Sequence, residues 1–154
     1  MVVNRSAPPG PVAPHLIYED PAAAIAWLCR AFGFRERYRY GRDGGVEGAL
    51  LAVGDGAVMI ASPRVGYGAA KRFTRRPPRP EEGSHSIGVR VEDVDGHYER
   101  AKASGARILL APETYPFGER QYTAQDCGGH LWTFSESVED VAPEAWGAFP
   151  AATG

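Results

Sequence analysis

The sequence predicts an α+β fold built from two copies of a βαβββ unit. The main observation is that one order of elements, a strand, a helix and then three strands, occurs twice along the chain. In both copies an acidic residue stands 13 positions before the glycine that ends the helix, Asp20 before Gly33 and Glu92 before Gly105. These two pairs are 72 residues apart, and we interpret that period as an internal duplication.

The first copy begins with a short strand-like run at residues 15–18 (HLIY). Asp20 and Pro21 form a helix-start signal, because aspartate is a good N-cap and proline fits the first helical position. Apolar side chains then recur at helical spacing up to Phe32, and Gly33 ends the helix. The strands expected after it are residues 35–40, whose side chains alternate, and the hairpin strands 47–53 and 57–62, joined by the turn 54–56.

The second copy repeats this order with the same local signals. Asp93 is the expected N-cap of a helix over residues 94–104, and Gly105 stops that helix. Trp132 and Phe134 alternate with Thr133 in the last strand, so we expect both aromatic rings to pack against the helix. The four strands expected in this copy are residues 86–91, 107–110, 118–126 and 131–136.

These elements divide the chain into five segments. A Pro-rich leader that we expect to be flexible comes first, and two modules are separated by a connector that contains six positive charges. We interpret the connector as a solvated linker, the alternative being a lid or an anion-attracting rim over a binding site. The segments are the leader 1–13, the first module 14–62, the connector 63–83, the second module 84–136 and a C-terminal tail 137–154.

Composition excludes several classes of protein. The net charge is −2, which does not favour nucleic acid as the main partner. The two cysteines show no CxxC spacing, so neither a disulfide framework nor a cysteine-based zinc site is expected. The sequence has no apolar stretch of membrane-spanning length and no signal-peptide pattern. We therefore expect a soluble cytoplasmic protein.

Three phrases of the sequence resemble one superfamily. They are YEDPAAAIAWLCRAFGF, HSIGVRVEDVDGHYERAKASGA and ERQYTAQDCGGHLWTFSE, and together they extend over residues 14–136. Their order and spacing are similar to those of the vicinal oxygen chelate superfamily, which includes glyoxalase I, bleomycin-resistance proteins and extradiol dioxygenases. The resemblance implies an open, cup-shaped mixed β-sheet with the helices outside. It also implies a homodimer, since modules of related proteins pair within or between chains.

The resemblance also identifies positions where a metal would be held. Metalloenzymes of this superfamily use His or Glu on the first and last strands of each module, and the matching positions here are Ala13, Ile60, Ser86 and Thr133. None of these side chains is a usual ligand of a divalent ion. His15, His85 and His130 lie near these positions but out of register with them. We therefore expect no metal and no other cofactor, with an off-register divalent-metal site as the alternative.

Arg90 is a candidate for contact with a ligand. It shares a strand face with Ser86 and Gly88, and a charged side chain there is costly unless water or an anionic group surrounds it. His15 is a candidate hydrogen-bonding group, and Tyr38 is a candidate for stacking on a planar ligand. Each candidate also has an ordinary structural role as its alternative. The candidate ligand-binding residues are His15, Tyr38, Ile60, Ser86, Arg90, Arg120, Tyr122 and Thr133.

Three function hypotheses follow, and we favour the first. It is a bleomycin-resistance-like protein that binds and sequesters a small organic molecule in the cup without a metal, as in antibiotic resistance. The second is a divalent-metal lyase, isomerase or dioxygenase of the glyoxalase type. The third is a metal-independent enzyme that uses the same cup. The balanced charge and Arg90 favour a neutral or anionic aromatic ligand over a cationic one, and the sequence identifies no catalytic residue.

Overall fold

The computed structural model describes residues 2–64 and 75–149, and its first four strands form one sheet. The strand order is β1-β4-β3-β2, with β1 parallel to β4 and the other pairs antiparallel. The hairpin predicted from the Gly-Asp-Gly turn joins β3 and β4. The strands are β1 (His15–Ile17), β2 (Arg35–Tyr40), β3 (Gly48–Val53) and β4 (Gly56–Ala61).

The second sheet repeats the topology of the first. Its order is β5-β8-β7-β6, with β5 parallel to β8 and the other pairs antiparallel. Two sheets of the same order confirm the predicted pair of βαβββ modules, and neither sheet closes into a barrel. The strands are β5 (Ile87–Arg90), β6 (Arg107–Thr114), β7 (Glu119–Gln125) and β8 (Leu131–Ser137).

Both predicted helices form, and their first turns are capped as the sequence indicates. In α1 (Pro21–Phe32) the Asp20 carboxylate accepts a hydrogen bond from the Ala23 amide, and Gly33 ends the helix with a φ of 72°. In α2 (Val94–Ala103) the Asp93 carboxylate accepts from the Gly96 amide. The positive φ at Gly33 explains why a glycine is needed there, because other residues rarely adopt it.

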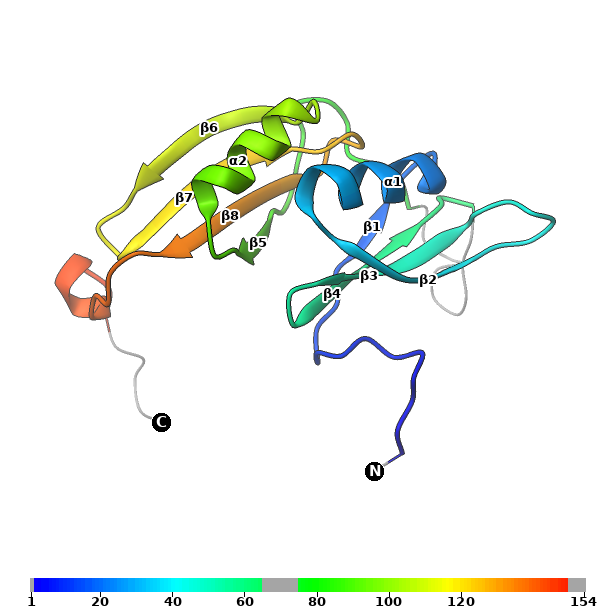
Figure 1. Cartoon of the computed structure of the whole chain (residues 1–154), viewed down its shortest axis with the longest axis horizontal. Helices are drawn as coiled ribbons and strands as arrows, with labels where there is room; N and C mark the ends of the chain where they lie inside the picture. Colours follow the sequence, from blue (N-terminus) through cyan, green and yellow to red (C-terminus); the bar gives the residue numbers. More distant parts are fainter. Residues whose placement is uncertain (1, 65–74, 150–154) are drawn as a thin grey trace.

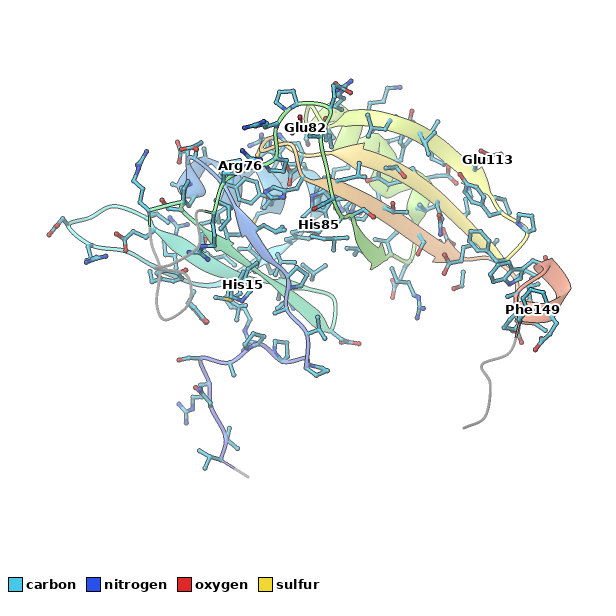
Figure 2. All side chains as sticks on the ribbon, turned by 180° about the vertical axis from the view of Figure 1, so that it is seen from behind. His15, Arg76, Glu82, His85, Glu113 and Phe149 are labelled. Atoms are coloured by element: carbon cyan, nitrogen blue, oxygen red, sulfur yellow. The ribbon has the colours of Figure 1, made fainter. Side chains whose placement is uncertain are left out.

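The two helices lie side by side on the same side of the molecule, while the sheets extend away from each other (Figure 1). Each helix covers one face of its own sheet. Seen from behind, the strands lie in front of the helices and show their opposite faces (Figure 2). We call these two sheet faces, which neither helix covers, the open faces.

One hydrophobic core joins the modules. Phe32, at the end of α1, packs against three rings of the second module, with centroid separations of 4.7 Å to Phe134, 5.6 Å to Trp132 and 6.0 Å to His97. Trp132 and Phe134 are fully buried, which confirms their predicted packing on the helix side. Burial of large aromatic rings is a major source of stability, so this shared core fixes the modules relative to each other.

The remaining parts of the chain differ in detail from the sequence prediction. Strand β6 continues to Thr114, beyond the predicted end at residue 110, and a short 3-10 helix, η2 (Pro143–Trp146), lies in the tail. Lys71 and Arg72 of the basic connector lie outside the described residues. None of the helices formed by the described residues has the length and apolar character needed to cross a membrane.

Candidate ligand-binding site

The open face of the second sheet carries the residue group predicted around Arg90. Val89 packs against the core, so Gly88 and Arg90 point to the opposite side and are exposed. Gly88 pairs with Thr133, and the Thr133 hydroxyl lies 3.3 Å from that of Thr123. Ser86 is exposed directly before this strand. The structure therefore brings Ser86, Arg90 and Thr133 to one face, as predicted.

The open face of the first sheet carries His15 and Tyr38. His15 pairs with Met59, and its side chain is exposed on the side opposite the buried Leu16 (Figure 2). Tyr38 is half-buried, and its hydroxyl donates a 2.7 Å hydrogen bond to the Ser6 carbonyl oxygen. This bond ties the Pro-rich leader to β2.

A groove runs along the boundary between the modules, and we call it the module groove. Its volume is about 530 Å³, within the range of small-molecule sites. One side comes from the leader and the β3–β4 hairpin, and the other from β5 and the residues after it. The lining residues are Val12, Pro14, residues 53–58 and residues 87–92.

The module groove is mostly apolar, with few charged groups. Arg90 lines it and makes no ion pair with a described residue. Asp55 and Glu92 also line the groove, so its walls carry both signs of charge. Within this lining the guanidinium of Arg90 is the group best suited to donate hydrogen bonds to a carbonyl or carboxylate oxygen.

Three predicted site residues face the helices instead of the open faces. Ile60 is fully buried and pairs with Leu16 in the core, so the expectation that it lines the cup is wrong. Tyr122 is fully buried under α2. Arg120 lies on the same face of β7 and forms a two-point ion pair with Asp95 of α2, at 2.8 and 2.9 Å. None of the three is placed to touch a ligand on the open faces.

The Tyr122 hydroxyl is part of a buried hydrogen-bond chain that connects the modules. It lies 2.6 Å from Nδ1 of His97, whose Nε2 lies 3.1 Å from the Phe32 carbonyl oxygen. A carbonyl can only accept, so Nε2 carries the proton and Tyr122 donates to Nδ1. Burial lowers the pKa of His97 and raises that of Tyr122, because both charged forms are poorly solvated there.

A second buried hydrogen-bond network surrounds Asp126. The sequence analysis did not identify this residue as a buried hydrogen-bond acceptor. Its carboxylate accepts hydrogen bonds from the Tyr18 hydroxyl at 2.5 Å and from the Trp132 indole at 2.8 Å. The amides of Gly128 and His130 donate to its other oxygen. Tyr18 belongs to the first module and Asp126 to the second, so this carboxylate also connects the modules. Burial, and next the charge of Asp126, raise the pKa of Tyr18.

The histidines do not form a metal site. His15 lies on the first sheet and His85 precedes β5, while Nε2 of His130 is committed to the Ile17 carbonyl oxygen at 2.8 Å. Within residues 2–64 and 75–149 no three His, Cys, Asp or Glu side chains are arranged so that they could hold a metal ion. The described residues of one chain therefore offer no ligand set for the divalent ion that metalloenzymes of the superfamily resembled by the sequence bind.

Another cavity lies on the helix side of the same module boundary. Its volume is about 480 Å³, and Phe32, His97 and Arg100 are among its lining residues. Arg90 and Glu92 contribute to this cavity as well as to the module groove. The module groove is the larger of the two, and it lies beside the predicted residues Ser86 and Thr133, so we take it as the candidate site.

Comparison with known proteins agrees with this architecture. The profile of the Glyoxalase/Bleomycin resistance protein/Dioxygenase superfamily matches residues 10–134. An uncharacterised protein of Mycobacterium bovis is 31% identical over 133 residues, which cover 84% of this chain and 85% of the relative.

Solved structures show the same arrangement of modules. TioX from Micromonospora sp. ML1 is 34% identical, with a TM-score of 0.66 over 82% of this chain and 97% of TioX. The fosfomycin resistance protein FosX from Listeria monocytogenes has a TM-score of 0.59 at 18% identity, over 82% of this chain and 92% of FosX. At that identity the likeness to FosX concerns the fold alone.

Proposed function

The chain belongs to the Glyoxalase/Bleomycin resistance protein/Dioxygenase superfamily, and from this premise we propose that it binds a small organic molecule in the module groove without a metal. The observation that carries the proposal is the groove itself, which has the volume of a small-molecule site and apolar walls with few polar groups. In this proposal the protein sequesters its ligand, as a resistance protein does.

The chemistry of the groove supports binding over catalysis. The titratable side chains that line it are Asp55, Arg90 and Glu92. The described lining residues include no histidine, cysteine or serine, and the groups able to accept a proton are the carboxylates of Asp55 and Glu92. A ligand held there meets apolar walls, one cationic donor and two carboxylates.

The ligand that fits best is an aromatic molecule with one hydrogen-bond acceptor. Its rings would contact apolar side chains such as Val12, Ala57 and Ile87, and its acceptor would take hydrogen bonds from Arg90. The acceptor can be neutral or anionic, whereas a cationic group in the same position beside Arg90 would meet the guanidinium charge. Gly88 leaves room beside Arg90, since no atom lies within 4 Å of the position that a Cβ would occupy.

Calorimetry with three matched naphthalenes tests the proposal. Naphthalene-2-carboxylate, its carboxamide and the corresponding methylammonium compound differ mainly in charge. We expect the carboxylate and the carboxamide to bind more tightly than the ammonium compound. Arg90→Ala should weaken carboxylate binding by about 1–3 kcal/mol, the usual cost of losing a charged hydrogen-bond partner.

Two variants provide the controls. Arg90→Lys keeps the charge and should retain part of the affinity, while Arg30→Ala removes an exposed arginine from the helix side and should leave it unchanged. Binding of the ammonium compound alone would contradict the proposal. So would equal affinities of the wild type and Arg90→Ala for the carboxylate.

A further inference from the structure

A further cavity lies beside strand β2, and we call it the β2 pocket. Its volume is about 440 Å³, and its walls come from β2, the end of β3, the turn at residues 54–56 and the leader. The same turn also lines the module groove, so the two cavities are neighbours. The lining residues are Pro9, residues 35–37, Ala52 and residues 54–56.

Strand pairing places the β2 pocket on the open face of the first sheet. Arg35 pairs with Ala52, which pairs in turn with Ala57 of the module groove. The next pair along these strands, Leu51 with Val58, belongs to the core, so the row that contains Arg35 points to the other side. Neighbouring strands are about 4.8 Å apart, and this row therefore extends about 10 Å from the groove to β2.

Two arginines give the β2 pocket its positive charge. Arg35 and Arg37 are exposed, so a ligand can reach them, and neither forms an ion pair with a described residue. Glu36 also lines the pocket, but its carboxylate is held by Arg39 through two hydrogen bonds of 2.6 Å. Asp55 is the other carboxylate of the lining. The unpaired charges are therefore two guanidinium groups and one carboxylate, which leaves a net positive charge.

The leader borders both cavities. A β-bulge in β2 turns Tyr38 to the open face, where its hydroxyl donates the 2.7 Å hydrogen bond to the Ser6 carbonyl oxygen. From this bond the leader continues past the β2 pocket, which Pro9 lines, and then past the module groove, which Val12 and Pro14 line. An elongated molecule that lies along the leader would therefore contact both cavities.

We propose that the β2 pocket binds the anionic end of the ligand whose apolar body occupies the module groove. This inference rests on the proposed function and specifies the ligand class, an elongated aromatic molecule with an acceptor for Arg90 at one end and a phosphate for Arg35 and Arg37 at the other. Two guanidinium groups match a phosphate monoester, which carries about two negative charges near pH 7 and accepts several hydrogen bonds. Between the two ends the row presents the small side chains of Ala52 and Ala57.

Binding of a small anion tests the β2 pocket without the module groove. In ¹H–¹⁵N NMR spectra of the arginine side chains, methyl phosphate should shift the Nε–H resonances of Arg35 and Arg37 in a saturable manner. The neutral trimethyl phosphate should leave them unchanged. Arg42 is the internal control, because it is exposed and follows the same strand but lies outside the lining. Equal shifts at Arg42, or no shift at Arg35 and Arg37, would overturn the proposal.

Two matched naphthalenes test the extended ligand by calorimetry. The compounds 6-hydroxynaphthalene-2-carboxylate and its phosphate ester differ only at the end away from the carboxylate. The phosphate ester should bind the wild type at least tenfold more tightly, as expected for hydrogen bonds between charged groups. In the double variant Arg35→Ala/Arg37→Ala the two compounds should bind equally, whereas Arg42→Ala should retain the difference.

The two experiments separate failure of this proposal from failure of the module groove. Equal affinities of the wild type for the two naphthalenes would overturn the proposal, and so would a preference for the phosphate ester that persists in the double variant. If neither naphthalene binds while methyl phosphate still shifts Arg35 and Arg37, the groove alone is contradicted. Both arginines are exposed and lack ion pairs with described residues, so the double variant should fold like the wild type.

Discussion

Removal of the Asp126 carboxylate should strongly destabilise the fold. Asp126 is only 7% exposed and accepts four hydrogen bonds, from Tyr18, Gly128, His130 and Trp132. The substitution Asp126→Ala leaves all four donors without this acceptor. Since Tyr18 comes from the first module and the other three from the second, the loss acts directly on the contact between modules.

The expected loss follows from these contacts. Each buried donor left unpaired costs about 1–3 kcal/mol, and the four costs do not add fully because the turn that contains Gly128 can relax. We expect Asp126→Ala to lower the free energy of unfolding by about 3–5 kcal/mol, the range seen when one partner of a buried charged interaction is removed. Tyr18→Phe removes one of the four bonds and should cost about 1–2 kcal/mol.

Urea denaturation followed by tryptophan fluorescence measures these losses. Asp140→Ala is the matched control, because Asp140 is exposed and surface substitutions usually change stability by less than about 0.5 kcal/mol. A loss below about 1 kcal/mol for Asp126→Ala, or one equal to that of the control, would refute the role assigned to this carboxylate.

Three other predictions concern pH, Arg120 and assembly. Burial lowers the pKa of His97 in the folded protein. As the pH falls below about 6.5, this side chain is therefore protonated in the unfolded chain before it is protonated in the folded one. The free energy of unfolding should consequently decrease from pH 7 to 5. In urea denaturation the free energy of unfolding of His97→Gln should decrease less over this pH range than that of the wild type. Equal decreases in the two proteins would contradict this prediction. Arg120→Ala should not change the affinity for naphthalene-2-carboxylate measured by calorimetry, since Arg120 faces α2. A weaker affinity of this variant would show that Arg120 does contribute to the binding site. We also expect a homodimer, because Leu109 and Leu110 are exposed in a single chain, and light scattering that finds only monomer at micromolar concentration would exclude it.

Local signals in the sequence predict most of the fold. Capping residues and helix-ending glycines act on their immediate neighbours, so they identify both helix starts and both helix ends correctly, at Asp20, Asp93, Gly33 and Gly105. The alternation around Thr133 likewise predicts that Trp132 and Phe134 are buried. These features depend on residues a few positions apart, which a single sequence shows directly.

Strand faces are harder to predict where both sides of a strand are buried. Val58 and Ile60 face α1, yet Ala57 and Ala61 on the other side are also buried, so hydrophobicity does not tell the faces apart. Counting along the chain consequently placed Ile60 on the wrong side. A shift of one residue exchanges the two faces of a strand.

A usable signal did exist for Tyr122. The turn between β7 and β8 pairs Tyr122 with Phe134, and directly paired residues point to the same face. Burial of Phe134 therefore implies burial of Tyr122. The Asp126 network offered no such signal, because its hydrogen bond to Tyr18 joins residues 108 positions apart, and only the folded chain brings them together.

A crystal structure with naphthalene-2-carboxylate tests the binding claim most directly. The account predicts electron density for the naphthalene in the module groove, with its rings against the apolar walls and its carboxylate within hydrogen-bond distance of the Arg90 guanidinium. Density for the compound only in the helix-side cavity near His97 and Arg100, or a groove without the compound at saturating concentration, would contradict it.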